Sequence, residues 1–95
     1  MIRVIIERRL KQGLYDEYAA IIRKAKKEAS RKSGFMGGEL YFDQDDRNKI
    51  VIIAAWDNLA NWQSWDQSKE RKALTGELTE IMDGPEKVTI LTSQR

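Results

Sequence analysis

The chain has 95 residues, with no cysteine, no histidine, one proline and a formal charge of +2. The lack of cysteine excludes disulfides, cysteine–zinc sites and a cysteine nucleophile. The lack of histidine removes the commonest general base, the commonest metal ligand and the usual proximal ligand of haem. Any chemistry must therefore use carboxylates, lysine, arginine, tyrosine or tryptophan, or the reactivity of the substrate itself.

Length, charge and hydropathy also limit the class of protein. A chain of this length is expected to form a single domain over residues 1–95. The small positive charge does not indicate nucleic-acid binding. Arg3 and Glu7 interrupt the first apolar run, so it does not resemble a signal peptide, and no apolar stretch reaches the ~18 residues of a membrane span. We therefore expect a soluble cytoplasmic protein that contacts neither membranes nor nucleic acids.

The first two elements are predicted to be a strand and a long helix. Residues 2–10 alternate between two faces, one of which carries Ile2, Val4, Ile6, Arg8 and Leu10. Residues 14–32 carry apolar side chains at helical spacings of three and four, namely Tyr15, Tyr18, Ile22, Ala25 and Ala29. Ser33-Gly34 is a typical stop signal for that helix.

Two further strands are predicted on either side of a polar hairpin loop. Phe35 to Phe42 forms the first of them and Lys49 to Trp56 the second. Residues 50–56 are apolar without alternation, which is typical of a strand buried on both faces. Helices cover only one face of the sheet in a two-layer domain. We therefore expect a second copy of the chain to cover the other face, in a homodimer.

The C-terminal part is predicted to contain a second helical region and a last strand. Leu59, Trp62, Trp65 and Lys69 lie on or near one helical face, and we expect a bend near Thr75-Gly76 before the helix ends at Gly84-Pro85. Residues 88–92 form the final strand. The order strand, helix, strand, strand, helix, strand is typical of an α+β ferredoxin-like fold, an antiparallel sheet with two helices on one face.

Several of these segments resemble one known family. They are Gly34-Phe35 at the start of the second strand, Glu39-Leu40-Tyr41 within it, Trp56 at the end of the third strand, Trp62, Trp65 and Ser68 on the next helix, and the Gly-Pro-Glu-Lys-Val run at 84–88. Together they resemble the antibiotic biosynthesis monooxygenase family of the dimeric α+β barrel superfamily. The resemblance implies two protomers packed sheet to sheet, each with a pocket between its sheet and its helices.

The resemblance also implies two chemistries. One branch of the family degrades haem with an asparagine, a tryptophan and a histidine, and these positions fall at Arg8, Trp65 and Thr75. Because only the tryptophan is kept, we expect no haem degradation. Another branch oxidises phenols with O₂ and no cofactor; its strand-three tryptophan falls at Trp56, its helix tyrosine at Trp62 and its strand asparagine at Ile52. The aromatic wall is thus kept and one polar group is lost.

Five residues are the candidates for binding a small aromatic molecule. Trp56, Trp62 and Trp65 either stack on a planar ring or fill the core, and Tyr18 is a candidate pocket wall. Arg8 lies on an apolar strand face, where it either holds a phenolate or carboxylate or extends into solvent at the strand end. No catalytic residue is assigned. The loop aspartates Asp43, Asp45 and Asp46 lack the spacing of a calcium loop, so no metal is expected.

Two functions remain open from the sequence. The first, by resemblance, is a cofactor-independent monooxygenase that acts on a small phenol or quinol. The alternative is a non-catalytic homodimer of the same fold that binds a small ligand or has a structural role.

Overall fold

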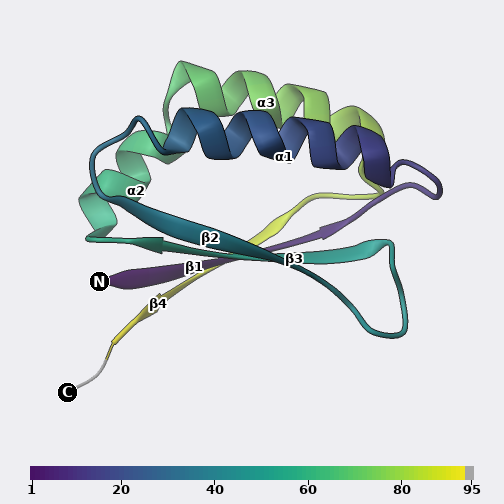
Figure 1. Ribbon diagram of the computed structural model, residues 1–95, viewed down its shortest axis with the longest axis horizontal. Coiled ribbons are helices and arrows are strands. Elements are labelled where there is room, and N and C mark those ends of the chain that lie inside the picture. The colour runs from purple at the N-terminus through teal and green to yellow at the C-terminus, as the bar shows by residue number, and fades with distance from the viewer. Residues whose placement is uncertain (94–95) are drawn as a thin grey trace.

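The computed structural model describes residues 1–93 and has two layers, a four-stranded antiparallel sheet and three helices that cover one face of it (Figure 1). Its elements in chain order are β1 (Ile2–Arg9), α1 (Tyr15–Ala29), β2 (Phe35–Phe42), β3 (Lys49–Trp56), α2 (Leu59–Asp66), α3 (Lys69–Ile81) and β4 (Lys87–Thr92). The strand order is β2-β3-β1-β4, so the fold is the predicted α+β ferredoxin-like fold.

β1 is a central strand whose alternation follows the prediction. Its register places Ile6 opposite Ile52 of β3 and opposite Val88 of β4. The predicted core face, from Ile2 to Leu10, is buried beneath the helices. The arginine on this face, Arg8, is buried with the apolar residues, so the core has a cation built into it.

The two faces of β3 differ in how far they are buried. Ile50, Ala54 and Trp56 are buried on the helix side. Val51 and Ile53 point to the opposite face, where neighbouring strands leave them half-buried. The helices therefore cover only one face of this apolar strand, as expected. A second copy on the opposite face stays a prediction.

α1 is shorter than predicted, and it buries Tyr18 and Ala29 of the predicted stripe together with Ile21. It ends at Ala29, and Ser30 caps it. Ile21 is buried, whereas the predicted core residue Ile22 is only half-buried. The reason is that α1 packs against both the sheet and α3. Ile22 faces the cavity between α1 and the sheet, so it is not covered by neighbouring side chains as Ile21 is.

The second helical region is broken at a different place from the one predicted. α2 ends at Asp66 and α3 starts at Lys69. Ser68 makes the break, because its hydroxyl donates to the carbonyl of Trp65 at 2.7 Å and accepts the amide hydrogen of Arg71 at 3.2 Å. The expected bend near Thr75-Gly76 is wrong, since both residues lie inside α3. An N-cap serine therefore decides the break, rather than the helix glycine.

Among residues 1–93, no helix combines the length and the apolar character that a membrane crossing requires.

Candidate functional site

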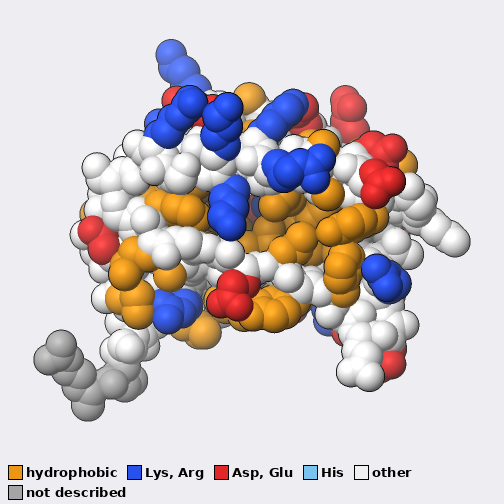
Figure 2. Space-filling view, viewed as in Figure 1, with side chains coloured by type: hydrophobic (Ala, Val, Ile, Leu, Met, Phe, Trp, Pro, Cys, Tyr) orange, Lys and Arg blue, Asp and Glu red, His pale blue; other side chains and the backbone are white. Residues whose placement is uncertain are grey.

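A cavity of about 280 Å³ lies between the sheet and the helices. It is hollowed into the face where α1 passes over β2, and its visible floor is apolar (Figure 2). Side chains from every layer line it, among them Ile6, Ile52 and Ala54 from the sheet, Ile22 and Ala25 from α1, and Leu74 and Leu78 from α3. A mostly apolar cavity with a few polar groups is the usual form of a small-molecule site.

The three tryptophans form one end of this cavity. The ring centroids of Trp56 and Trp62 are 6.1 Å apart in an edge-to-face arrangement, and those of Trp56 and Trp65 are 6.5 Å apart with nearly parallel planes. All three are buried, and all three also line the cavity. The indoles are therefore core residues that also present surface to the cavity, and stacking on a bound ring stays a prediction.

Arg8 also lines the cavity, and its guanidinium is held by two partners. Its Nε donates to Oε1 of Glu86 at 3.0 Å, and its Nη1 donates to the hydroxyl of Tyr18 at 3.0 Å. The side chain is only 5% exposed, so Arg8 does not extend into solvent at the strand end. The exposed alternative for this residue is therefore wrong, and contact of Arg8 with a phenolate or carboxylate ligand stays a prediction.

Tyr18 does not line the cavity. It is fully buried behind Arg8, and the Arg8 guanidinium carbon lies 5.9 Å from its ring centroid. Burial raises the pKa of the Tyr18 hydroxyl, an effect that the nearby charge of Arg8 only partly offsets. Tyr18 therefore keeps its proton at neutral pH and helps to position Arg8; contact with a ligand stays a prediction.

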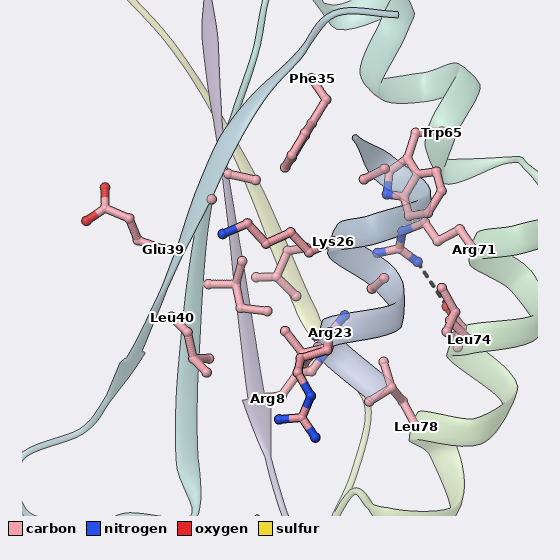
Figure 3. Close-up of a pocket in the computed structure, with 18 of the residues that line it drawn as sticks. Arg8, Arg23, Lys26, Phe35, Glu39, Leu40, Trp65, Arg71, Leu74 and Leu78 are labelled. Atoms are coloured by element: carbon pink, nitrogen blue, oxygen red, sulfur yellow. Dashed lines mark hydrogen bonds between the residues drawn. The ribbon is translucent and has the colours of Figure 1, made fainter. Parts of the chain in front are cut away.

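A second buried arginine, Arg71 of α3, lines the cavity and was not among the predicted residues. Its Nη2 donates to Oε2 of Glu86 at 3.0 Å, and its Nη1 donates to the hydroxyl of Thr75 at 3.1 Å. Figure 3 shows its guanidinium next to Trp65, and its Cζ lies 5.4 Å from the ring centroid of Trp62. The spacing of Arg71, Leu74 and Leu78 is a helical stripe that could have placed this arginine on the buried face.

Glu86 holds the two arginines together from the segment before β4. Its Oε1 contacts Arg8 and its Oε2 contacts Arg71. Burial alone would raise its pKa, but the charge of Arg8 and the hydrogen bond from Arg71 outweigh burial and hold the pKa below the ordinary value. Glu86 is therefore ionised at neutral pH.

The mouth of the cavity carries further charge. Arg23 and Lys26 of α1 line it and are exposed, and they extend toward it in Figure 3. Within the described part of the chain, Glu39 is the one acidic residue in the lining, and its carboxylate points away from the cavity (Figure 3). The lining side chains thus favour an anionic ligand over a cationic one.

Two positions that matter for the family resemblance also line the cavity. Ile52 contributes an aliphatic side chain from β3, and Thr75 accepts its hydrogen bond from Arg71. Within residues 1–93, no three acidic, histidine or cysteine side chains gather closely enough to hold a metal ion.

The sequence profile of the antibiotic biosynthesis monooxygenase family matches residues 1–76. The chain belongs to this family. None of the curated proteins matches the chain in sequence.

Solved structures agree with the family fold. A conserved protein from Methanosarcina mazei superposes with a TM-score of 0.90 at 16% identity, over 98% of this chain and 92% of that one. A protein from Mycobacterium tuberculosis gives 0.86 at 15% identity, over 99% and 95%. SnoaB from Streptomyces nogalater, described as a cofactor-independent oxygenase, gives 0.84 at 16% identity, over 99% and 94%. At these identities the likeness shows the fold alone.

Proposed function

We propose that this member of the antibiotic biosynthesis monooxygenase family is a cofactor-independent monooxygenase whose substrate is a small aromatic phenol or quinol. One observation carries the proposal: a cavity of about 280 Å³ has three indoles at one end and buried arginine side chains in its wall. The size and apolar walls suit a ligand of one to three fused rings, and the family and the solved oxygenase of the same fold support the reaction class.

The proposed oxidation requires the protein only to bind the ring, exclude water and favour the phenolate. A phenolate is electron-rich enough to give an electron to O₂, and overall a phenol and O₂ yield a quinone and water, with one oxygen atom entering the ring. Trp56, Trp62 and Trp65 stack on the ring and exclude water from it. The positive charge of Arg8 lowers the pKa of a bound phenol and so favours the reactive anion.

We further propose that the occupant is not haem. The position that carries a haem-ligand histidine in one family branch is Thr75, whose hydroxyl is a poor haem ligand and is engaged by Arg71. A titration that gave the sharp absorption band of ligated haem with one haem bound per chain would contradict this part of the proposal.

One observation favours the second candidate, a ligand-binding protein without turnover. Glu86 and Glu39 are not placed as general bases, because Glu86 is held by two arginines and the carboxylate of Glu39 points away from the cavity. A substrate that does not ionise readily would then bind without reacting.

Oxygen uptake separates the two candidates. The purified protein is mixed with a panel of hydroquinones and naphthols in an oxygen electrode, while ligand binding is followed by quenching of tryptophan fluorescence. The oxygenase proposal predicts protein-dependent uptake with at least one compound. Quenching without uptake would leave binding as the function, and the absence of both would show that the cavity is not an aromatic site.

We also propose that the chain is a homodimer. The sheet face opposite the helices carries Val51, Ile53, Tyr41 and Leu91, and Tyr41 and Leu91 are 45% and 50% exposed. A bare apolar sheet face is typical of an interaction surface. The same face carries Arg3 and Lys87 as well as Glu7 and Glu39, so its charges can pair when two copies meet face to face about a two-fold axis.

A further inference from the structure

Arg8 and Arg71 lie in the cavity wall and share Glu86, and a role for them in ligand binding rests on the proposed aromatic site. Two guanidinium groups share one carboxylate, each taking a different oxygen of Glu86 at 3.0 Å. Glu86 therefore holds the two guanidinium groups next to the same carboxylate. The cluster keeps an excess of positive charge, because Glu86 neutralises only one of the two arginines.

Asp66 offsets this excess only in part. Its Oδ1 lies 3.3 Å from Nε of Arg71, but its side chain is 46% exposed and its charge is therefore screened by water. Arg8 and Arg71 are 5% and 10% exposed at the side chain, so their charges are screened much less. The two arginines consequently keep part of their positive charge at the wall of the cavity.

The two arginines also have hydrogen-bond donors to spare. Each terminal guanidinium nitrogen carries two N–H bonds. Nη1 of Arg8 donates one N–H to the hydroxyl of Tyr18, and Nη1 of Arg71 donates one N–H to the hydroxyl of Thr75. Nη2 of each arginine contacts Glu86. Among the described residues 1–93, these contacts leave a second N–H bond on each nitrogen, in side chains that line the cavity.

We propose that the Arg8–Arg71 pair binds a carboxylate carried by the aromatic ligand, so that the substrate class is a phenol or quinol that also carries a carboxylate group. The ring lies against the tryptophans, and the carboxylate takes the remaining donors of the two guanidinium groups. Arg71 is a specificity-determining residue in this arrangement, and Glu86 competes with the ligand carboxylate for the donors of both arginines.

Calorimetry with two probes of equal shape tests the proposal. 2-Naphthoate carries the carboxylate, and 2-naphthamide replaces it with a neutral group. The wild-type chain should bind 2-naphthoate about tenfold or more tightly than 2-naphthamide at neutral pH, as charge-assisted hydrogen bonds require. Equal affinity for the two probes would overturn the carboxylate site while leaving the aromatic site standing, and binding of neither would remove the proposed function as well.

Three variants locate the preference. Arg71→Gln should remove most of it, by weakening 2-naphthoate about tenfold and 2-naphthamide less than about twofold. Lys27→Gln, an exposed position of α1 outside the cavity lining, is the matched control and should change either affinity by less than about twofold. If Lys26→Gln and not Arg71→Gln removed the preference, the carboxylate would lie at the mouth and the proposal would be wrong.

Glu86→Gln tests whether the two arginines bind the ligand carboxylate or only stabilise the fold by pairing with Glu86. Removing the competing carboxylate leaves both guanidinium groups for the ligand, so 2-naphthoate should bind as tightly as before or more tightly, although the variant is less stable. Weaker 2-naphthoate binding by folded Glu86→Gln, with 2-naphthamide binding unchanged, would contradict it.

Discussion

Arg8 and Glu86 lie 78 positions apart in the sequence and form an ion pair in which Nη2 of Arg8 is 3.0 Å from Oε1 of Glu86. The pair joins the central strand β1 to the segment that leads into β4, and Arg71 adds α3 to the same carboxylate. One carboxylate thus connects three parts of the fold at the wall of the cavity.

Glu86→Gln should lower the free energy of unfolding by roughly 2–4 kcal/mol at neutral pH, since it leaves two buried arginines without their anion. The pKa of Glu86 is lowered in the folded chain, so the wild-type advantage is complete above the ordinary glutamate pKa of 4.5 and is lost as pH falls through the folded-state pKa. Urea unfolding of both proteins at several pH values measures this. A difference that stayed constant down to acidic pH would show that the Glu86 charge is not its source.

Gly34→Ala should destabilise the chain by about 1–3 kcal/mol, because Gly34 has a φ of 89° and an added Cβ would collide with the carboxylate of Asp57. The same corner holds a hydrogen bond from the amide of Asp57 to the carbonyl of Gly34 at 2.9 Å. Gly76→Ala is the matched control, since Gly76 lies inside α3 with open space around it and should gain about 0.5–1 kcal/mol. Thermal unfolding should move in opposite directions for the two variants; equal shifts would exclude this explanation.

Ile53→Asp should dissociate the proposed dimer, because it places a charge in the middle of the sheet face opposite the helices. Light scattering should give a mass of twice 11.0 kDa for the wild type and a lower mass or an unfolded chain for the variant. Ala20→Asp puts the same charge on an exposed position of α1 and should leave the mass unchanged. A folded wild-type monomer at micromolar concentration would contradict the dimer.

Ala25→Phe should fill part of the cavity, because Ala25 lines it from α1. We expect ligand binding and oxygen uptake to be lost, while the free energy of unfolding stays the same or rises by up to about 1 kcal/mol. Ala20→Phe, on the exposed side of the same helix, should keep both activities and cost about 0.5 kcal/mol. Undiminished binding by Ala25→Phe would mean that the ligand lies elsewhere.

The strands and their faces could be predicted from the sequence because a strand has a short repeat and β1 obeys it from Ile2 to Leu10. The buried stripe of α1 could be placed only to within one residue. Ile21 and Ile22 are both apolar, and the packing of α1 on α3 and the sheet decides which of them is buried.

Of the two buried arginines, only Arg8 could be singled out from the sequence. Arg8 stands out as a cation on an apolar strand, but Arg71 follows a helix break that was expected elsewhere, so its phase relative to Trp62 and Trp65 was lost. Glu86 gave no periodic signal, because it lies between α3 and β4 and meets both arginines only through the tertiary fold. Local sequence patterns do not predict contacts between segments that lie far apart in the sequence.

The most direct test of the aromatic cavity is a titration of the isotope-labelled chain with 2-naphthol, followed through the indole N–H signals of its three tryptophans by nuclear magnetic resonance. Trp56, Trp62 and Trp65 all line the cavity, so all three signals should shift and reach saturation together. Three stationary indole signals, at concentrations where other signals of the protein move, would contradict the account.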